Sequence, residues 1–247
     1  MKLNILTYNI HKGFNWNNSK LILHDIRQMV RTTDADLVFL QEVVGENKIL
    51  EAQREDWITT PQYEFLADSI WSDFAYAKNA IYDQRHHGNV ILSKYPINTW
   101  EQIPISTNRY EQRGVLFCEI QLSEKQIVHA YCVHLDLTPK GRFQQYQKLI
   151  EIITLRTPKE VPLLIAGDFN DWDQQACYAL EEKLQVEECF KRLNGNYAKT
   201  FPVFLPMLAL DRLYSRHYRP LKSEVLKNAL WRKLSDHAAL YIEGELL

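Results

Sequence analysis

Short polar segments end several apolar runs of this chain, and this pattern most constrains what it can fold into. The runs have the length of buried β-strands, and the polar residues at their ends are Asn9, Glu42, His134, Asp168–Asn170, Asp211 and Asp236–His237. In α/β proteins, strand ends and the loops beside them carry the side chains that meet a ligand. The set offers carboxylates, imidazoles and carboxamides, with no candidate Ser or Cys nucleophile. Such groups can hold a divalent metal and activate water, so the sequence indicates a metal-dependent phosphoesterase.

Length and composition are those of an ordinary globular protein. Of the 247 residues, 46% are apolar and 24% are charged, and no repeat, low-complexity segment or linker interrupts them. We therefore predict one domain over residues 1–247, present as a monomer. The four cysteines lack metal-binding spacing, and the N-terminal apolar stretch is too short and too polar for a signal peptide. No window offers about 18 uncharged apolar residues, so we expect no transmembrane segment and a cytoplasmic location.

Apolar periodicity predicts an α/β (α+β) chain in which strands outnumber helices. The expected strands cover residues 3–10, 37–40, 89–93, 115–122, 127–133 and 163–166, and two later strands end near Tyr214 and Ile242. The expected helices are one that Ser19 caps and that carries an apolar stripe to Val30, and others over residues 44–56, 143–153 and 173–184. Some neighbouring strands are joined by links too short for a crossover helix, so we expect a mixed sheet.

The segment Gly167–Asn170 is the strongest local signal for chemistry. An apolar strand runs directly into a glycine, which favours a tight bend and presents Asp168 and Asn170 on one rim. Asp168 is a candidate general base or water-orienting group, and Asn170 is a candidate hydrogen-bond donor to a phosphoryl oxygen. The alternative is an Asx-turn that only closes a loop.

Other carboxylates lie next to predicted strands. Glu42 follows the run 37–40 and is a candidate Mg²⁺ ligand, because a buried carboxylate is costly without a cation; the alternative is a glutamate that faces water. Asp236 and His237 precede the last strand and should point to opposite faces, so that one serves a metal or water and the other acts as a base. Asp211 begins another strand and is the candidate that orients His237. The alternative is an ordinary Asp–His pair.

His134 closes an apolar run and has two interpretations. It is either a group that bonds to the phosphate or protonates the leaving group, or a core imidazole satisfied by a carbonyl. Asn9 has the same ambiguity. None of these residues decides the function singly. Their ordered appearance at strand ends favours a common site.

Taken in order, the motifs resemble the endonuclease/exonuclease/phosphatase superfamily, which includes DNase I, exonuclease III, apurinic endonucleases, inositol-polyphosphate 5-phosphatases and neutral sphingomyelinases. The resemblance covers residues 3–243, and Asn-Ile-His-Lys-Gly and Trp71-Ser-Asp-Phe resemble an uncharacterised bacterial branch. It rests on Thr-Tyr-Asn9-Ile, Leu-Gln-Glu42-Val, Gly88-Asn89-Val-Ile-Leu-Ser-Lys-Tyr-Pro, Arg113-Gly-Val, Val-His134-Leu, Gly-Asp168-Phe-Asn170, Leu-Asp211-Arg and Ser-Asp236-His237.

The resemblance implies a fold, a cofactor and a set of roles. The fold is a four-layer α/β sandwich of two packed mixed sheets flanked by helices, with the site at one edge between them. The cofactor is Mg²⁺ or Mn²⁺. The implied metal-side residues are Glu42 as the main ligand, with Asn9 and Asp236 nearby. The implied catalytic residues are His237 paired with Asp211, Asp168 on the water, and Asn170 and His134 on the scissile phosphate, with Asn89 and Arg113 in support.

The chain departs from the apurinic-endonuclease pattern at two positions. His11 stands where that branch has a second carboxylate beside the metal. His134 stands where that branch has a tyrosine, which favours the members similar to DNase I and the sphingomyelinases. The metal ligands of the apurinic branch therefore do not transfer directly to this chain.

The sequence constrains the substrate less than the reaction. Residues 212–233 hold seven Lys or Arg and one acid, which predicts either a positive surface for nucleic acid or a solvated face with counter-charges. The apolar run 201–210 either touches a membrane interface beside the site or packs as a core loop. Lys78 and residues 85–87 fall in a predicted polar loop that either binds a phosphate head group or faces solvent. The candidate substrates are phosphodiesters or phosphomonoesters of nucleic acid, phospholipid head groups or inositol phosphates. The alternative class is a non-catalytic binding module.

Overall fold

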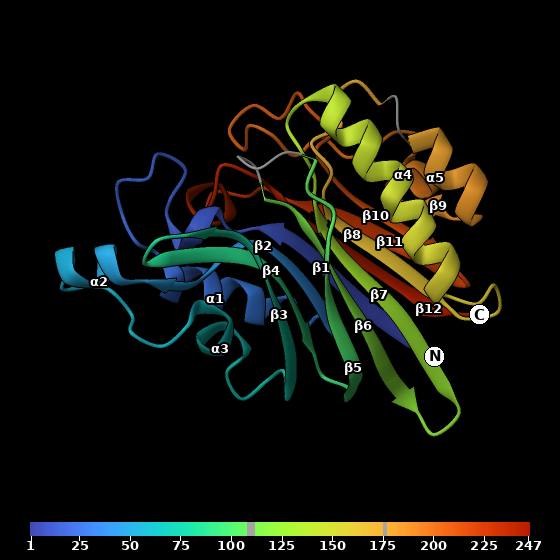
Figure 1. Cartoon of the computed structure of the whole chain (residues 1–247), viewed down its shortest axis with the longest axis horizontal. Helices are drawn as coiled ribbons and strands as arrows, with labels where there is room; N and C mark the ends of the chain where they lie inside the picture. The colour runs from blue at the N-terminus through green and yellow to red at the C-terminus, as the bar shows by residue number, and fades with distance from the viewer. Residues whose placement is uncertain (108–111, 175–176) are drawn as a thin grey trace.

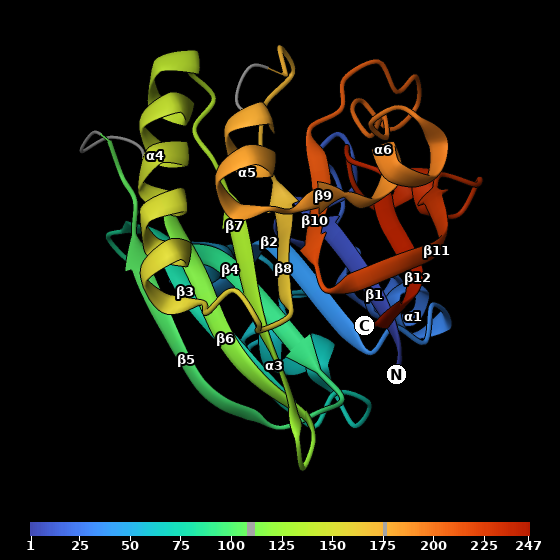
Figure 2. The ribbon, with the colours of Figure 1, turned by 90° about the vertical axis from the view of Figure 1, so that its right-hand side faces the viewer.

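Two six-stranded sheets pack face to face, with helices on their outer faces, in the computed structural model (Figures 1 and 2). The structure describes residues 1–107, 112–174 and 177–247. The first sheet has the order β11-β12-β1-β2-β4-β3, formed by Tyr218–Leu226, Ala239–Leu246, Lys2–Asn9, Leu37–Asn47, Arg85–Ser93 and Asp73–Tyr82. The second has the order β5-β6-β7-β8-β10-β9, formed by Ile97–Pro104, Gly114–Ser123, Gln126–His134, Leu163–Asp168, Asp211–Arg216 and Glu187–Glu188.

Each sheet is mixed. The pairs β1–β2 and β7–β8 are parallel, and the other neighbouring pairs are antiparallel. The helices are α1 to α6 and the short 3₁₀ turns η1 and η2, over Leu23–Thr32, Lys48–Gln53, Gln62–Ala67, Pro139–Arg156, Cys177–Leu184, Cys189–Asn194, His11–Gly13 and Trp231–Lys233. No helix in the described part of the chain is long and apolar enough to cross a membrane.

Successive apolar side chains of the central strands point to opposite faces of each sheet and form three apolar layers. Leu37 and Phe39 of β2 point into the space between the sheets, whereas Val38 and Leu40 point outward against α1 and α3. On the second sheet, Tyr146 of α4 packs on the outer face of β7 and β8. Both faces of these strands are therefore buried, which explains their continuous apolar runs. The predicted fold class, a four-layer α/β sandwich, is confirmed.

The structure corrects several predicted boundaries in the first third of the chain. The first helix begins at Leu23, and the Ser19 hydroxyl bonds instead to the Asn17 side chain at 2.7 Å, within a turn. Strand β2 does not stop at Glu42 but continues to Asn47, so only residues 48–53 of the predicted helix 44–56 are helical. The charged residues 44–56 were interpreted as helix-like, but the first four of them continue β2, where β-bulges shift the register.

Other predicted elements also differ from the structure. The predicted helix 173–184 begins at Cys177, with residues 175–176 outside the described part. Phe143, expected on the buried stripe of α4, is 63% exposed. Strand β5 was not predicted because most of its side chains face solvent, so no apolar alternation marks it. Strands β3 and β11 were missed as well, and like β5 they lie at sheet edges.

Candidate active site

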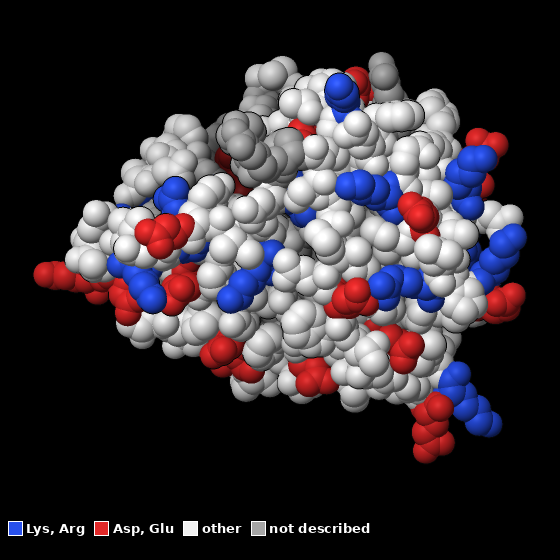
Figure 3. All heavy atoms as spheres, in the orientation of Figure 1, with Lys and Arg blue, Asp and Glu red and all other residues white. Residues whose placement is uncertain are grey.

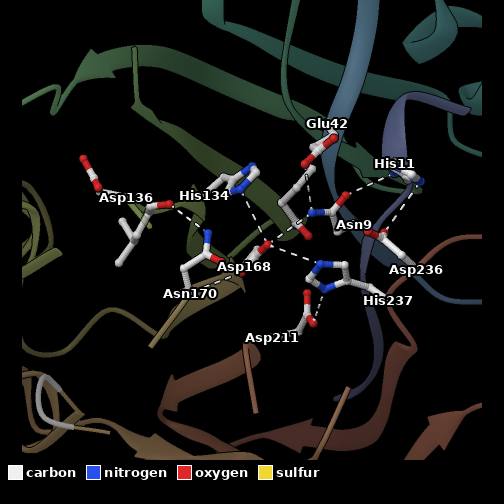
Figure 4. Close-up of polar contacts among 12 residues, drawn as sticks. Asn9, His11, Glu42, His134, Asp136, Asp168, Asn170, Asp211, Asp236 and His237 are labelled. Atoms are coloured by element: carbon white, nitrogen blue, oxygen red, sulfur yellow. Dashed lines mark hydrogen bonds and ion pairs between the residues drawn. The ribbon is translucent and has the colours of Figure 1, made fainter. Parts of the chain in front are cut away.

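The candidate residues meet at one edge of the two packed sheets (Figure 4). Asn9 ends β1, His134 ends β7 and Asp168 ends β8, so parallel pairing brings these termini to one side. Antiparallel β10 begins at the same edge with Asp211. In the sheet register Asp168 is flanked by His134 on one neighbouring strand and by Asp211 on the other. The fold therefore brings together residues that lie far apart in the sequence.

His237 and Asp211 form a buried pair. The imidazole Nδ1 lies 2.8 Å from Asp211 Oδ2, and Nε2 lies 3.8 Å from Asp168 Oδ2. Burial alone would lower the pKa of His237, but Asp211 and, more weakly, Asp168 raise it to about 10. The ring is therefore an imidazolium near neutral pH, held in one orientation by Asp211.

Asp168 lies at the centre of the group. Its Oδ2 accepts a hydrogen bond from Asn9 Nδ2 at 3.1 Å and lies 3.5 Å from His134 Nε2. Its Oδ1 accepts the Asn170 backbone N–H at 3.0 Å, so the Asx-turn exists and also holds the carboxylate in the site. Burial raises the pKa of Asp168, and His237 opposes that rise. An ionised Asp168 is therefore stabilised mainly by the imidazolium.

Asn170 and His134 complete this side of the site. Asn170 has φ 50, and its Nδ2 donates to the Leu135 carbonyl at 3.0 Å, which fixes the carboxamide and leaves its second N–H. Burial and the nearby Arg113 lower the pKa of His134 well below its usual value. The His134 ring is therefore neutral at pH 7, so one ring nitrogen donates a hydrogen bond and the other accepts one.

Glu42 occupies the β-bulge of β2. Its φ is 58, and the register moves from Leu40↔Val90 to Val43↔Gly88 across it. The carboxylate Oε2 lies 2.8 Å from Lys12 Nζ. Burial would raise the pKa of Glu42, but the adjacent Lys12 ammonium lowers it well below its usual value. Glu42 is therefore ionised, and the bulge turns it into the site instead of toward the helices.

Asp236 and His237 point in different directions, as predicted. Asp236 Oδ1 lies 3.7 Å from His11 Nδ1, and Ser235, which precedes it, donates its hydroxyl to the Asn9 carbonyl at 2.7 Å. Asn9 in turn lies 3.5 Å from Glu42 Oε1. A continuous series of contacts thus joins Glu42 to Asp236 through Asn9 and His11, as Figure 4 shows.

Two sets of side chains have donor atoms suited to a divalent metal. The carboxylates of Glu42 and Asp236 and the carboxamide oxygen of Asn9 are the kind of donors that Mg²⁺ or Mn²⁺ takes, with water completing the shell. Ligand atoms of Asp168, Asp211 and His237 lie within 4.8 Å of one another. Both sets already have protein partners, because His237 Nδ1 lies 2.8 Å from Asp211 Oδ2 and Lys12 Nζ lies 2.8 Å from Glu42 Oε2.

Two residues implied as supporting have different surroundings. Asn89 is fully buried on β4, and its Nδ2 donates to the carbonyls of Gly114 and Cys132, each at 3.2 Å. This side chain ties the two sheets together beneath the site and contacts no candidate catalytic group. Arg113 lines a cavity beside Glu42 and His134.

Sequence reasoning missed Lys12 and Gln62. Lys12 lies inside the quoted Asn-Ile-His-Lys-Gly motif, but nothing in the motif shows that its ammonium contacts Glu42. Gln62, on α3, is buried and donates to the Lys12 carbonyl at 2.8 Å while accepting the Val44 N–H at 2.9 Å. It holds the turn that bears Lys12 against β2. This role of Gln62 depends on its contacts with the turn and with β2, which are distant in the sequence. No local sequence pattern therefore marks Gln62.

Three of the seven basic residues in the stretch 212–233 form ion pairs with acidic side chains. Arg212 is fully buried and pairs with Asp171 at 3.1 Å. Lys222 pairs with Glu243, and Arg219 pairs with Glu245. In the view of Figure 3, Lys and Arg are interspersed with Asp and Glu over the surface. These pairs favour the interpretation as a face with counter-charges at three positions, and a positive surface over the rest of the stretch stays a prediction.

The apolar run 201–210 divides into buried and exposed parts. Val203 is fully buried, whereas Leu205 and Met207 are 67% and 59% exposed. The ring of Phe201 lies 5.0 Å from that of His237, so this run adjoins the site. Phe204 contacts the half-exposed Trp16, with ring centroids 5.0 Å apart. The exposed apolar surface therefore begins close to the candidate catalytic group.

Residues 85–87 are not in a loop. Arg85, His86 and His87 belong to β4, and Lys78 belongs to its hairpin partner β3. The three β4 residues line the cavity beside Glu42, whereas Lys78 does not. The loop prediction was wrong because Asp83 and Gln84 alone form the turn between these strands.

Known proteins resemble this chain in sequence. The model of the Endonuclease/Exonuclease/phosphatase family matches residues 6–237. The "uncharacterized protein YbhP" of Escherichia coli K12 is 45% identical over 244 residues, which are 98% of this chain and 96% of that one.

Several solved structures are similar in fold, and two of them serve as examples. An endonuclease/exonuclease/phosphatase from Beutenbergia cavernae superposes with a TM-score of 0.82 at 17% identity, covering 99% of this chain and 72% of that one. The mannosyl-6-phosphatase Bt3783 of Bacteroides thetaiotaomicron superposes with a TM-score of 0.73 at 18% identity, covering 99% and 100%. Because the family model covers nearly the whole chain, this protein belongs to the endonuclease/exonuclease/phosphatase family.

Proposed function

We propose that the chain hydrolyses a phosphate ester by attack of water, with a divalent metal, Mg²⁺ or Mn²⁺, held by Glu42 together with Asn9 and Asp236. The observation that carries the proposal is the buried His237–Asp211 pair facing Asp168, with the ionised Glu42 on the opposite side of Asn9. When bound, the metal would neutralise charge that develops on the phosphoryl oxygens.

The remaining roles follow from the hydrogen bonds. Asp168 is the acceptor for a proton of the attacking water, because its Oδ2 faces the site between the two imidazoles. His237 donates from Nε2 to a phosphoryl oxygen, while Asp211 keeps the ring oriented. The free N–H of Asn170 and the His134 ring are placed to bond to the same phosphate.

The substitution His237→Ala tests these roles. We expect it to lower kcat by about 10²–10⁴, the usual contribution of a positioned acid or base. The measurement is hydrolysis of bis-p-nitrophenyl phosphate and p-nitrophenyl phosphate with Mg²⁺, with Mn²⁺ and with EDTA. The matched control is His217→Ala, an exposed histidine whose ring bonds only to the Lys159 carbonyl. Equal turnover of His237→Ala and the parent protein would refute the assignment, and activity that survives EDTA would refute the metal.

The relative rates of hydrolysis of the same two chromogenic substrates distinguish a phosphomonoesterase from a phosphodiesterase. The structural neighbour Bt3783 is named a mannosyl-6-phosphatase, so phosphomonoesters belong in the assay beside diesters. Nucleic acid is the weaker candidate, because three of the basic residues in the stretch 212–233 form ion pairs with acidic side chains and the chain as a whole has a net charge of −2. A monomeric, cytoplasmic enzyme remains a prediction from the sequence.

A phospholipid diester is the second candidate. The exposed Leu205 and Met207 next to Phe201 give an apolar surface adjoining His237. Sedimentation with vesicles of phosphatidylcholine and sphingomyelin tests it, with Leu205→Ser as the variant that should lose binding. Absence of the protein from the vesicle pellet would exclude the lipid reading without affecting the hydrolase proposal.

A further inference from the structure

A cavity of about 480 Å³ opens beside the proposed metal-side carboxylate. Six of its lining residues matter for the argument: Lys12, Glu42, Arg85, His87, Arg113 and His134. Glu42 and His134 also belong to the candidate catalytic group, so the cavity continues that site toward the β3–β4 hairpin. Its size is in the range of small-molecule pockets, which have room for more than one phosphate.

The cavity carries an excess of positive charge. Lys12 and Arg85 both line it, and Glu42 is the one carboxylate among its described lining residues, already in contact with Lys12 at 2.8 Å. Burial and the adjacent Lys12 lower the pKa of His87 to about 4, so His87 adds no charge at pH 7 and can still donate a hydrogen bond. Such a lining attracts an anion.

The wall that bears Arg85 is built from sheet and is not a loose loop. Arg85 pairs in register with Asn47 of β2 and Tyr82 of β3. Beside it, the His86 Nδ1 is 2.9 Å from the Tyr76 hydroxyl, and a Cβ on Gly45 would lie 2.2 Å from His86 Cε1. A side chain at position 45 would push the ring away, so the close approach of β2 fixes this wall. The Arg85 guanidinium also lies 4.9 Å from the Tyr82 ring centroid, which favours a defined direction.

We propose that this cavity binds a second anionic group of the substrate, a phosphate monoester, next to the ester that is cleaved. The preferred substrates are then small esters with two phosphates, one held by the cavity and one placed between Asn170 and His237. Arginine suits this task because its planar guanidinium can bond to two phosphate oxygens at once. This proposal adds a substrate preference to the proposed hydrolase function. Only its kinetic test rests on that function.

A matched pair of chromogenic substrates provides that test. Thymidine 5′-(p-nitrophenyl phosphate) is compared with the same compound carrying a 3′-phosphate, so that only the second phosphate differs. We expect a kcat/KM about tenfold higher for the bisphosphate, mainly through KM, and a ratio reduced to about twofold or less in Arg85→Gln. Arg85→Lys should keep part of the preference, and Arg219→Gln, which changes an exposed arginine of β11, should keep all of it. A ratio near one in the parent protein, or an unchanged ratio in Arg85→Gln, would overturn the proposal.

Equilibrium binding separates this proposal from the function of the enzyme. Calorimetry under conditions in which no ester is hydrolysed measures the affinity for three ligands. It compares thymidine 3′,5′-bisphosphate and inositol 1,4-bisphosphate with thymidine 5′-phosphate. Tighter binding of either bisphosphate, lost in Arg85→Gln, supports the cavity even if no ester is hydrolysed, and it distinguishes a nucleoside from a cyclitol carrier. Equal binding of all three ligands sinks the proposal even if hydrolysis is efficient.

Discussion

Asp168 illustrates how single residues gain their properties from their neighbours. Its Oδ2 accepts a hydrogen bond from Asn9 and lies 3.5 Å from His134 Nε2 and 3.8 Å from His237 Nε2, while Oδ1 accepts the Asn170 backbone N–H. Without them, burial would favour the neutral acid. The same residue in an open loop would be an ordinary surface carboxylate. Its chemistry therefore depends on the pairing of β8 with its two neighbours.

The raised pKa of His237 predicts how stability depends on pH. The folded protein binds the imidazolium proton more tightly than the unfolded chain, whose histidine has a pKa near 6.5. The stabilisation is complete below about pH 6.5 and is lost as pH rises toward 10. We expect the free energy of unfolding to fall by up to about 1.4 kcal/mol per pH unit in that window from this residue.

Urea denaturation at pH 6.5, 8 and 9.5 measures this slope. His237→Gln removes the titrating group and should flatten the profile, whereas His217→Gln, at an exposed ring, should not. Parallel profiles for the parent protein and His237→Gln would show that Asp211 does not hold a proton on this ring.

At the scale of elements, the turn η1 and the bulge of β2 depend on each other. His11, Lys12 and Gly13 have φ values of 47, 58 and 80, a run of left-handed conformations that isolated residues avoid. Gln62 stabilises the turn from outside by bonding to the Lys12 carbonyl and to the Val44 N–H. One side chain therefore positions both the ammonium and the carboxylate of the Lys12–Glu42 contact.

Replacing Gln62 by Ala should destabilise this region. The Val44 N–H is buried and would lose its partner, which costs about 1–3 kcal/mol. We expect that loss in the free energy of unfolding, together with a weaker affinity for Mn²⁺ measured by electron paramagnetic resonance. Gln53→Ala, at an exposed position of α2, is the control. Wild-type Mn²⁺ affinity in Gln62→Ala would mean that Glu42 is positioned without this bond.

Elements differ in how far the sequence predicts them. The strands that contribute Asn9, His134 and Asp168 have continuous apolar runs, because both of their faces are covered, and the sequence shows them clearly. The edge strand β5 and the bulged half of β2 lack such a pattern. The bulge also turns Glu42 into the site. The sequence therefore predicts the residue type at position 42 but not the direction of its side chain.

At the scale of the whole molecule, the candidate site joins both ends of the chain. Asn9 comes from β1 and His237 directly precedes β12, and these two strands pair with each other near the middle of the first sheet. The order of motifs along the sequence allowed the set of residues to be predicted. The contact between Lys12 and Glu42 and the cavity lined by β4 depend on packing between distant segments, which periodicity does not encode.

Metal binding should therefore stabilise the molecule globally. A ligand that binds only the folded state adds about 2.7 kcal/mol at a concentration of one hundred times its Kd. We expect Mg²⁺ to raise Tm reversibly, EDTA to cancel the rise, and Glu42→Gln to reduce it strongly. The matched control is Glu51→Gln, an exposed acid on α2. The same Tm increase in Glu42→Gln as in the parent protein would place the ion elsewhere.

The pairing of β1 with β12 also has a consequence for biosynthesis. Lys2 lies opposite Glu245 in the register, so β1 stays without one of its two neighbours until residues close to Glu245 have been made. A nascent chain that ends before residue 237 also lacks the imidazole of the proposed site. Completion of the first sheet and assembly of that site therefore both wait for the synthesis of the same late segment.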